Sequence, residues 1–285
     1  MKPTLGFIGL GLMGGPMAMR LLDAGYTVHI FNRTKEKAAS LITKGALWND
    51  SAADLAKNAD IVFSMVTNDT AVREVTNAVQ SGLRPGGIHV DCSTVSPSLT
   101  SDIEQEYDST KRFFLHSPVL GGIKEAAAGE LLVFTGGSED AFVRCEEALT
   151  VIGKKTWRFP KAALASHTKL IMNSFIAGMM ATMGQALSYA NRAQIDGKTI
   201  LDILNSSKLN SASFQAKGKL MVEQQFTPSF FLENLLKDTN LFRDAASTID
   251  LSTPVADTVK ALLEKGVARG YGKEDYSAIV KVFHQ

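Results

Sequence analysis

The segment Gly6-Phe7-Ile8-Gly9-Leu10-Gly11-Leu12-Met13-Gly14 decides the fold of the first half of this chain. Three of its glycines have the spacing G-x-G-x-x-G, directly after an apolar run and at the start of a helical pattern. Glycines so placed permit a tight turn and a close approach of the backbone to a pyrophosphate, which the helix N-terminus then stabilises. A lone match is weak, but here the strand, the helix and the next strand are all in place. We therefore predict a dinucleotide site lined by Gly9, Leu10, Gly11, Leu12, Met13 and Gly14.

Strand and helix patterns alternate through the first half of the chain. Strand-like segments recur at Thr4–Ile8, Thr27–Phe31, Asp60–Val66, Gly87–Asp91, Phe113–Leu115, Leu131–Thr135 and Lys155–Arg158. Helical patterns separate them at Gly14–Ala24, Lys35–Lys44, Ala52–Ala59, Thr70–Val79 and Glu139–Ile152. This alternation predicts an α/β fold for residues 1–160, a Rossmann domain with a doubly wound, mostly parallel sheet.

The strand pattern disappears after Pro160, and residues 161–285 read as an all-α domain. A helix of about thirty residues is predicted from Ala165 to Ile195, and at ~1.5 Å per residue it would span roughly 45 Å. Such a length is typical of an interdomain helix that joins two bodies. This helix has more apolar and small-residue surface than one small domain needs. We therefore expect a homodimer or homotetramer.

Composition excludes several classes of protein. With a net charge of +1 over 285 residues and 45% apolar residues, the chain has no basic stripe for nucleic acid. No apolar run reaches membrane-spanning length, so no membrane association is expected. Nothing requires a disulfide between the two cysteines, Cys92 and Cys145, which favours a cytoplasmic protein. The histidines lack ligand spacing on a shared element, so no metal site is predicted.

The end of the second strand indicates which dinucleotide binds. An NAD site usually places an acid there for the ribose hydroxyls, whereas this chain has Asn32-Arg33-Thr34. Arg33 offers a guanidinium to a 2′-phosphate, Thr34 offers a hydroxyl, and Lys37 lies one turn further on. The alternative is an ordinary polar turn between strand and helix. Given the upstream glycines, we predict NADP(H) as the cofactor, with Asn32, Arg33 and Thr34 in contact with it.

Several motifs along the chain, and the order in which they follow one another, resemble those of the β-hydroxyacid dehydrogenases, the 3-hydroxyisobutyrate dehydrogenase-like family. Phe7 to Gly14 looks like the opening signature of that family. The later motifs are Asp91-Cys92-Ser93-Thr94, Pro118-Val119-Leu120-Gly121-Gly122, Lys169 with Asn173, and Leu236-Lys237-Asp238. The branch that the chain is most similar to is the short NADPH-dependent glyoxylate/succinic semialdehyde reductases.

The resemblance implies roles for particular residues. Lys169 would give a proton to the carbonyl oxygen as hydride arrives at carbon, and Asn173, on the same helical face, would orient it or the substrate. Lys237 would reach the cofactor from the second domain, and Gly121-Gly122 would present N–H groups to a substrate carboxylate. The other implied cofactor contacts are Val66, Thr67, Asn68 and Thr94, and the other implied substrate contacts are Ser93, Leu120, Phe231 and Asp238. Phe230, Asn234, Lys237 and Asp238 would share a helical face, although core packing explains the two phenylalanines equally well.

Two departures from the family pattern affect the substrate. The family has a serine where this chain has Leu120, which removes a hydroxyl expected to hold the substrate carboxylate. The family also has a glycine-rich segment just before its catalytic lysine. The corresponding residues of this chain, Ala163 to Thr168, include no glycine. Both changes favour an aldehyde or ketone without the usual carboxylate.

We therefore predict an oxidoreductase that uses NADPH to reduce a small aldehyde or keto acid to the hydroxy acid, and catalyses the reverse. An imine reductase is an alternative, although such enzymes more often carry an acid or a tyrosine in place of Lys169. A non-catalytic dinucleotide-binding protein is a second alternative. The joint presence of Lys169, Asn173 and Lys237 argues against it.

Overall fold

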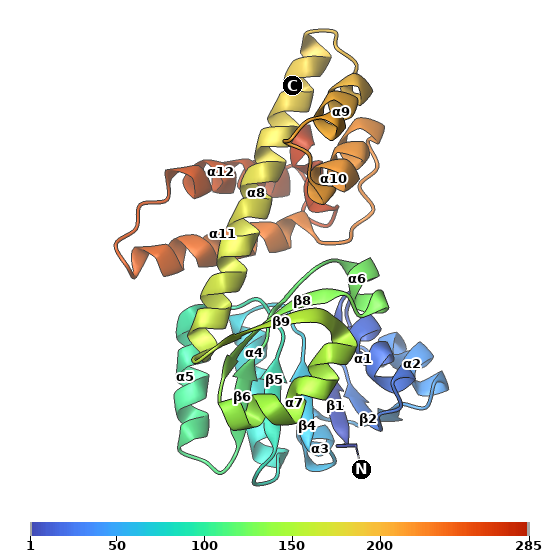
Figure 1. The fold of residues 1–285 in the computed structure, drawn as a ribbon, viewed down its shortest axis with the longest axis vertical. Helices are drawn as coiled ribbons and strands as arrows, with labels where there is room; N and C mark the ends of the chain where they lie inside the picture. The colour runs from blue at the N-terminus through green and yellow to red at the C-terminus, as the bar shows by residue number, and fades with distance from the viewer. Residues whose placement is uncertain (1, 284–285) are drawn as a thin grey trace. The chain divides into compact units, whose positions relative to one another are not determined.

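The computed structural model describes residues 2–283 and divides into two compact units (Figure 1). The first unit ends at Lys169 and the second begins at Leu170. The boundary predicted between residues 160 and 161 falls between strand β9 (Gly153–Phe159) and helix α8 (Ala162–Arg192). The first two turns of α8 therefore pack with the unit that precedes them.

The first unit is built on a single sheet. Its other strands are β1 (Leu5–Ile8), β2 (Val28–Phe31), β3 (Leu47–Trp48), β4 (Ile61–Ser64), β5 (Ile88–Asp91), β6 (Phe113–His116), β7 (Val119–Leu120) and β8 (Leu131–Gly137). The order across the sheet is β3-β2-β1-β4-β5-β6-β8-β7, and β9 pairs with β8. Strands β1 to β6 run parallel, whereas β8 runs antiparallel to β6 and to β7. The chain reverses its direction across the sheet between β1 and β4, which is where open α/β sheets bind ligands.

Helices cover both faces of this sheet (Figure 1). They are α1 (Gly14–Asp23), η1 (Lys35–Ala38), α2 (Ala39–Thr43), α3 (Ala52–Lys57), α4 (Asp69–Gly82), α5 (Pro97–Asp108), α6 (Ile123–Ala128) and α7 (Glu139–Ile152). Phe7 and Ile8 are neighbours in β1 but belong to different cores, because successive side chains of a strand point to opposite faces. Phe7 packs in the core that contains α1 and α7, and Ile8 in the core that contains α3, α4 and α5. Burial on both faces explains the nearly continuous apolar runs of the central strands.

The regular secondary structure described in the second unit is helical. Beyond most of α8 it contains α9 (Gly197–Ser206), α10 (Ala212–Glu223), α11 (Leu232–Ser247), α12 (Pro254–Ala268) and the 3₁₀ segment η2 (Tyr276–Phe283). Its core joins Met180 of α8, Met221 of α10 and Leu235 of α11 to Leu263 of α12 and Ile279 of η2. Between residues 170 and 283, the one β-type pairing is the isolated bridge Phe231–Asp275. The predicted fold class, a Rossmann sheet followed by a helical domain, is confirmed.

Several boundaries differ from the prediction. The long helix begins and ends three residues earlier than expected, and the Lys35–Lys44 pattern splits into η1 and α2. Strands β3 and β7 have two residues each, too few for a periodic signal. Helix α5 was also missed, although its start carries a recognisable signal: the Ser96 side chain caps it and Pro97 occupies its first turn.

The expectation that no apolar run reaches membrane-spanning length is wrong. Helix α8 is long and apolar enough to cross a membrane by length and composition, with an 18-residue window of mean hydropathy 1.3. The helix contains polar residues such as Asn173 and Ser174, but they are too few to lower the mean hydropathy below that of a membrane-spanning helix. In that window, 44% of the residues are buried inside the protein, and buried core helices satisfy the same criterion.

Candidate active site

Four of the predicted cofactor segments lie at one edge of the sheet. Gly9 to Gly14 follows β1, Asn32 to Thr34 follows β2, Val66 to Asn68 lies shortly after β4, and Thr94 lies shortly after β5, next to the predicted substrate contact Ser93. These four strands run parallel, so their carboxyl ends meet at the same edge. Strand β7 shares this direction, because it runs antiparallel to β8, which runs antiparallel to β6. The turn of Gly121 and Gly122 therefore leaves the sheet toward the same edge.

The glycine loop has the geometry that a pyrophosphate needs. Gly9 adopts φ +93°, and a Cβ there would lie 2.2 Å from the Met65 carbonyl oxygen. A Cβ on Gly14 would lie 1.9 Å from the Gly9 carbonyl oxygen, so both positions require glycine. A Cβ on Gly11 would meet nothing within 4 Å, which leaves the backbone open to a ligand. The residues present therefore fit a dinucleotide.

Asn32 braces the glycine loop. Its side-chain oxygen accepts a hydrogen bond from the Leu10 N–H at 2.9 Å, and its amide nitrogen donates to the Thr34 carbonyl at 2.8 Å. The side chain thus ties the loop after β1 to the turn after β2. Arg33 and Thr34 beside it are exposed, so they are accessible to a ligand at this edge.

The loops after β4 and β5 are joined through Asp91. The buried Ser93 hydroxyl donates to Asp91 Oδ1 at 2.8 Å and accepts from the Val66 N–H at 2.9 Å. Asn68, in contrast, caps helix α4 by accepting from the Ala71 N–H at 2.9 Å. Ser93 and Asn68 therefore shape the loops on which Val66, Thr67 and Thr94 stand, and Thr67 is exposed there.

Asp91 belongs to a buried polar network between β4, β5 and β6. The Ser64 hydroxyl contacts Asp91 Oδ1 at 2.8 Å and His89 Nε2 at 2.9 Å, and His116 Nδ1 lies 3.2 Å from Asp91 Oδ2. Burial disfavours the Asp91 carboxylate, but the hydrogen bond and charge of His116 outweigh this and hold its pKa below the usual value. Burial lowers the pKa of the His89 imidazole to about 4, against the attraction of Asp91. His89 is therefore neutral in the folded protein at neutral pH.

This network predicts that acid destabilises the fold. A pKa lower in the folded than in the unfolded chain gives stability that is present above about pH 6.5 and is lost as the pH falls toward 4. For His89 alone, the free energy of unfolding should fall by roughly 2 kcal/mol between about pH 7.5 and about pH 5. Urea unfolding at the two pH values measures this. His89→Gln should flatten the dependence, and an unchanged slope in this variant would disprove the assignment.

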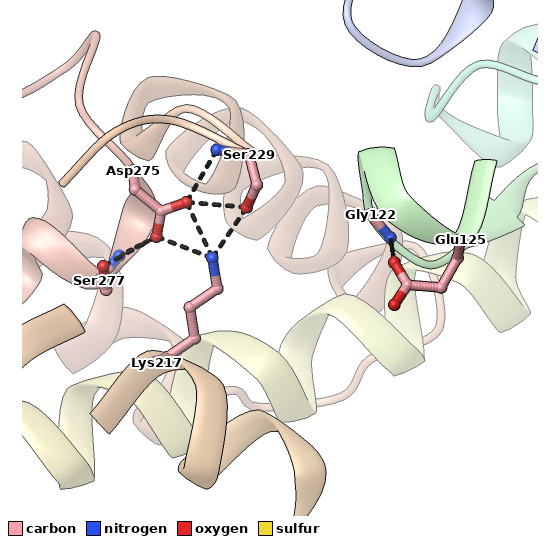
Figure 2. A network of polar contacts seen from close by, with 6 residues as sticks. All are labelled: Gly122, Glu125, Lys217, Ser229, Asp275 and Ser277. Atoms are coloured by element: carbon pink, nitrogen blue, oxygen red, sulfur yellow. Dashed lines mark hydrogen bonds and ion pairs between the residues drawn. The ribbon is translucent and has the colours of Figure 1, made fainter. Parts of the chain in front are cut away.

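The turn after β7 differs from the predicted anion site. The Gly122 N–H, expected to bind a substrate carboxylate, donates instead to Glu125 Oε2 at 2.7 Å (Figure 2). Leu120 is half-buried, and Gly121 adopts φ +143°. The sequence motifs did not single out Glu125, although an acid three residues after a helix N-cap is a known capping signal.

The start of α8 is fixed against the loop after β5. Ser166, one turn before Lys169, donates its hydroxyl hydrogen to the Val95 carbonyl at 2.5 Å. Lys169 is only 8% exposed. Burying an ammonium group is costly unless it serves a function or is well paired, so this lysine is a candidate for chemistry rather than a solvated surface residue.

Within the second unit, Asp238 connects two of the predicted site residues. Asn173 Nδ2 donates to Asp238 Oδ2 at 2.6 Å, and Lys237 Nζ lies 2.8 Å from Asp238 Oδ1. Asn173 and Asp238 are both buried. The predicted role of Asp238 was substrate contact, whereas its observed contacts orient Asn173 and Lys237.

Phe231 stands at the N-terminus of α11, and Phe230 precedes the helix. The prediction that Phe230 shares a helical face with Asn234 and Lys237 is therefore wrong; Phe230 packs edge-on to Tyr276 in the core. Phe231 is half-buried and bridges to the backbone of Asp275.

A buried ion pair fixes the segment before α11 (Figure 2). Lys217 Nζ lies 2.8 Å from Asp275 Oδ2, and the same oxygen accepts from the Ser229 N–H at 3.0 Å and its hydroxyl at 2.8 Å. The other carboxylate oxygen accepts from the N–H and hydroxyl of Ser277. These contacts hold the pKa of Asp275 below its usual value despite its burial. No local pattern in the sequence pointed to this pair, because its members are far apart along the chain.

Comparison with known proteins agrees with this architecture. Residues 4–161 match the family model described as the NAD binding domain of 6-phosphogluconate dehydrogenase. Residues 163–283 match the model described as NAD-binding of NADP-dependent 3-hydroxyisobutyrate dehydrogenase.

Individual relatives cover nearly the whole chain. The 2-(hydroxymethyl)glutarate dehydrogenase of Eubacterium barkeri is 31% identical, over 99% of this chain and 95% of that protein. The chloroplastic glyoxylate/succinic semialdehyde reductase 2 of Arabidopsis thaliana is 27% identical, over 98% and 78%. The crystal structure of a 3-hydroxyisobutyrate dehydrogenase from Salmonella typhimurium matches with a TM-score of 0.91 at 29% identity, over 98% of this chain and 99% of that one. The resemblance inferred from the motifs is confirmed: this chain belongs to the 3-hydroxyisobutyrate dehydrogenase family of oxidoreductases.

Proposed function

We propose that this protein uses NADPH to reduce small aldehydes or keto compounds to the hydroxy compounds, and catalyses the reverse reaction. The observation that carries the proposal is the burial of Lys169 on the helix that also carries Asn173, itself hydrogen-bonded to Asp238. A lysine held away from water suits a proton donor better than a surface charge.

The roles follow from the chemistry of a carbonyl group. When bound, NADPH supplies the hydride for the carbonyl carbon. Lys169 delivers the proton to the carbonyl oxygen, which becomes the hydroxyl of the product, and accepts it in the reverse reaction. Asn173 orients the substrate or the lysine, and Asp238 fixes the rotamer of Asn173.

Preference for NADPH is supported by the turn after β2. Arg33 and Thr34 are exposed there, and no carboxylate takes the place of the usual ribose-binding acid. Asn32 is engaged in bracing the glycine loop, so its contribution is to the shape of the site.

A panel of short aldehydes, ketones and cyclic imines, followed by the loss of NADPH absorbance, tests the proposal. We expect turnover of carbonyl compounds and little of imines. Turnover of imines alone would point to the imine reductase alternative. Tight NADPH binding without turnover of any compound would indicate a non-catalytic binding protein.

We also propose a homodimer or homotetramer. Ile171, Phe175 and Tyr189 on α8 are 48%, 61% and 73% exposed, which leaves an apolar stripe on this helix for a second copy to cover. Light scattering at micromolar concentration should give a mass at least twice that of one chain, and a monomer would contradict the proposal.

A further inference from the structure

The turn between β7 and α6 determines what group a substrate can place beside it. Strand β7 ends at Leu120, Gly121 and Gly122 form the turn, and Glu125 lies in the first turn of α6. By its strand direction this turn leaves the sheet at the edge that holds the glycine loop. Helix α6, which follows this turn, packs against α1, which follows the glycine loop. A substrate bound beside the glycine loop would therefore meet the polar groups that the turn presents.

The turn offers little to an anion. Leu120 contributes an apolar side chain. Gly121 cannot be replaced by a polar residue without strain, because its φ is +143° and a Cβ would lie 2.8 Å from Leu131 Cδ2 and 3.1 Å from Glu125 Cβ. The Gly122 N–H already donates to the Glu125 carboxylate at 2.7 Å, as Figure 2 shows.

Glu125 adds a negative charge at the same place. Its side chain is half-buried, and a Cβ on Gly122 would lie 3.1 Å from its Oε2. Lys124, the cation on α6, is exposed, so solvent screens its charge more strongly. A substrate carboxylate at this turn would have to displace Glu125 from the amide and would meet its charge at short range, which is unfavourable.

We infer that Glu125 is a specificity-determining residue that excludes carboxylates, and that the preferred substrates are uncharged aldehydes or ketones. This inference rests on the proposed function, because it assumes that the reaction takes place at this edge of the sheet. Glu125 acts twice, by occupying the Gly122 amide and by repelling anions.

Matched pairs of substrates test the inference. Succinic semialdehyde and methyl 4-oxobutanoate differ only in the group remote from the aldehyde, which is a carboxylate in the first and an uncharged methyl ester in the second. Glyoxylate and methyl glyoxylate form a shorter pair. The measured quantity is the ratio of kcat/KM for ester over acid. Since both values come from the same preparation, any loss of folded enzyme in a variant cancels in the ratio.

The wild type should prefer the esters by about tenfold or more. Glu125→Gln removes the charge but keeps an acceptor for the Gly122 N–H, so the ratio should fall partway toward one. Glu125→Ala also frees the amide and should lower the ratio by roughly ten- to a hundredfold relative to the wild type. Adding Leu120→Ser to Glu125→Ala should favour the acids further.

Glu130→Ala is the matched control, because it removes an equal charge from an exposed position just beyond α6. Its ratio should equal that of the wild type. A wild type that prefers the acids, or a ratio that both Glu125 variants leave unchanged, would overturn the inference while the reductase activity stands. Failure to reduce any carbonyl compound in the panel would overturn the proposed function and the inference together.

Discussion

Replacing Lys169 with alanine should lower kcat by ~10²–10⁴, the usual effect of removing a positioned proton donor. Lys169→Met keeps much of the length and apolar stem without the charge and should behave alike. Lys169→Arg should also have a low kcat, because a guanidinium does not release its proton near neutral pH. Steady-state kinetics on the best carbonyl substrate measures these effects.

NADPH binding provides the control for Lys169. The predicted cofactor contacts lie mainly on the loops after β1, β2, β4 and β5, so affinity for NADPH should survive in Lys169→Ala. Lys161→Ala, an exposed lysine just before α8, should leave turnover unchanged. Full turnover by Lys169→Ala would eliminate the proposed mechanism and move the proton source to water or Asp238.

Asn173→Ala should be milder for turnover than Lys169→Ala. It should chiefly raise KM if Asn173 only orients the substrate. The structure adds a second consequence, because the variant deprives the buried Asp238 carboxylate of a hydrogen bond of 2.6 Å. A loss of thermal stability should therefore accompany the kinetic change.

Replacing Arg33 with alanine should weaken NADPH binding about ten- to a hundredfold. The physical reason is the loss of a charge-assisted contact to the 2′-phosphate, worth ~1.5–3 kcal/mol. Arg33 is exposed and lies next to the bracing Asn32, so its removal should not disturb the glycine loop. Isothermal titration with NADPH measures the change.

NADH is the internal control for Arg33, because it lacks the 2′-phosphate that the guanidinium would bind. Its affinity should change little in Arg33→Ala. A wild type that prefers NADH, or a variant that loses affinity for both dinucleotides equally, would show that Arg33 has a different role.

Local patterns in the sequence were sufficient for much of the fold. The continuous apolar strands and the glycine spacing predict a parallel sheet with a dinucleotide loop. Both signals can be read within a few consecutive residues, because a buried strand is an apolar run and the tight turn requires glycine at fixed positions. Short elements escaped detection for the same reason. Strands β3 and β7 have two residues each and exist only through pairing with longer neighbours.

The sequence by itself thus determined the fold class, the family and the candidate residues Lys169, Asn173 and Arg33, since each stands in a motif of contiguous or helically spaced residues. Only the tertiary structure decided what those residues contact. It showed that Asn32 braces the Leu10 amide, that Asp238 holds Asn173, and that Glu125 occupies the amide of Gly122. Hydrogen bonds depend on atomic positions within a few tenths of an ångström, and those positions result from the packing of segments that are distant in sequence or from the rotamer that a side chain adopts. Of these three contacts, only that of Glu125 with Gly122 is local enough for a residue pattern, the capping signal, to indicate it.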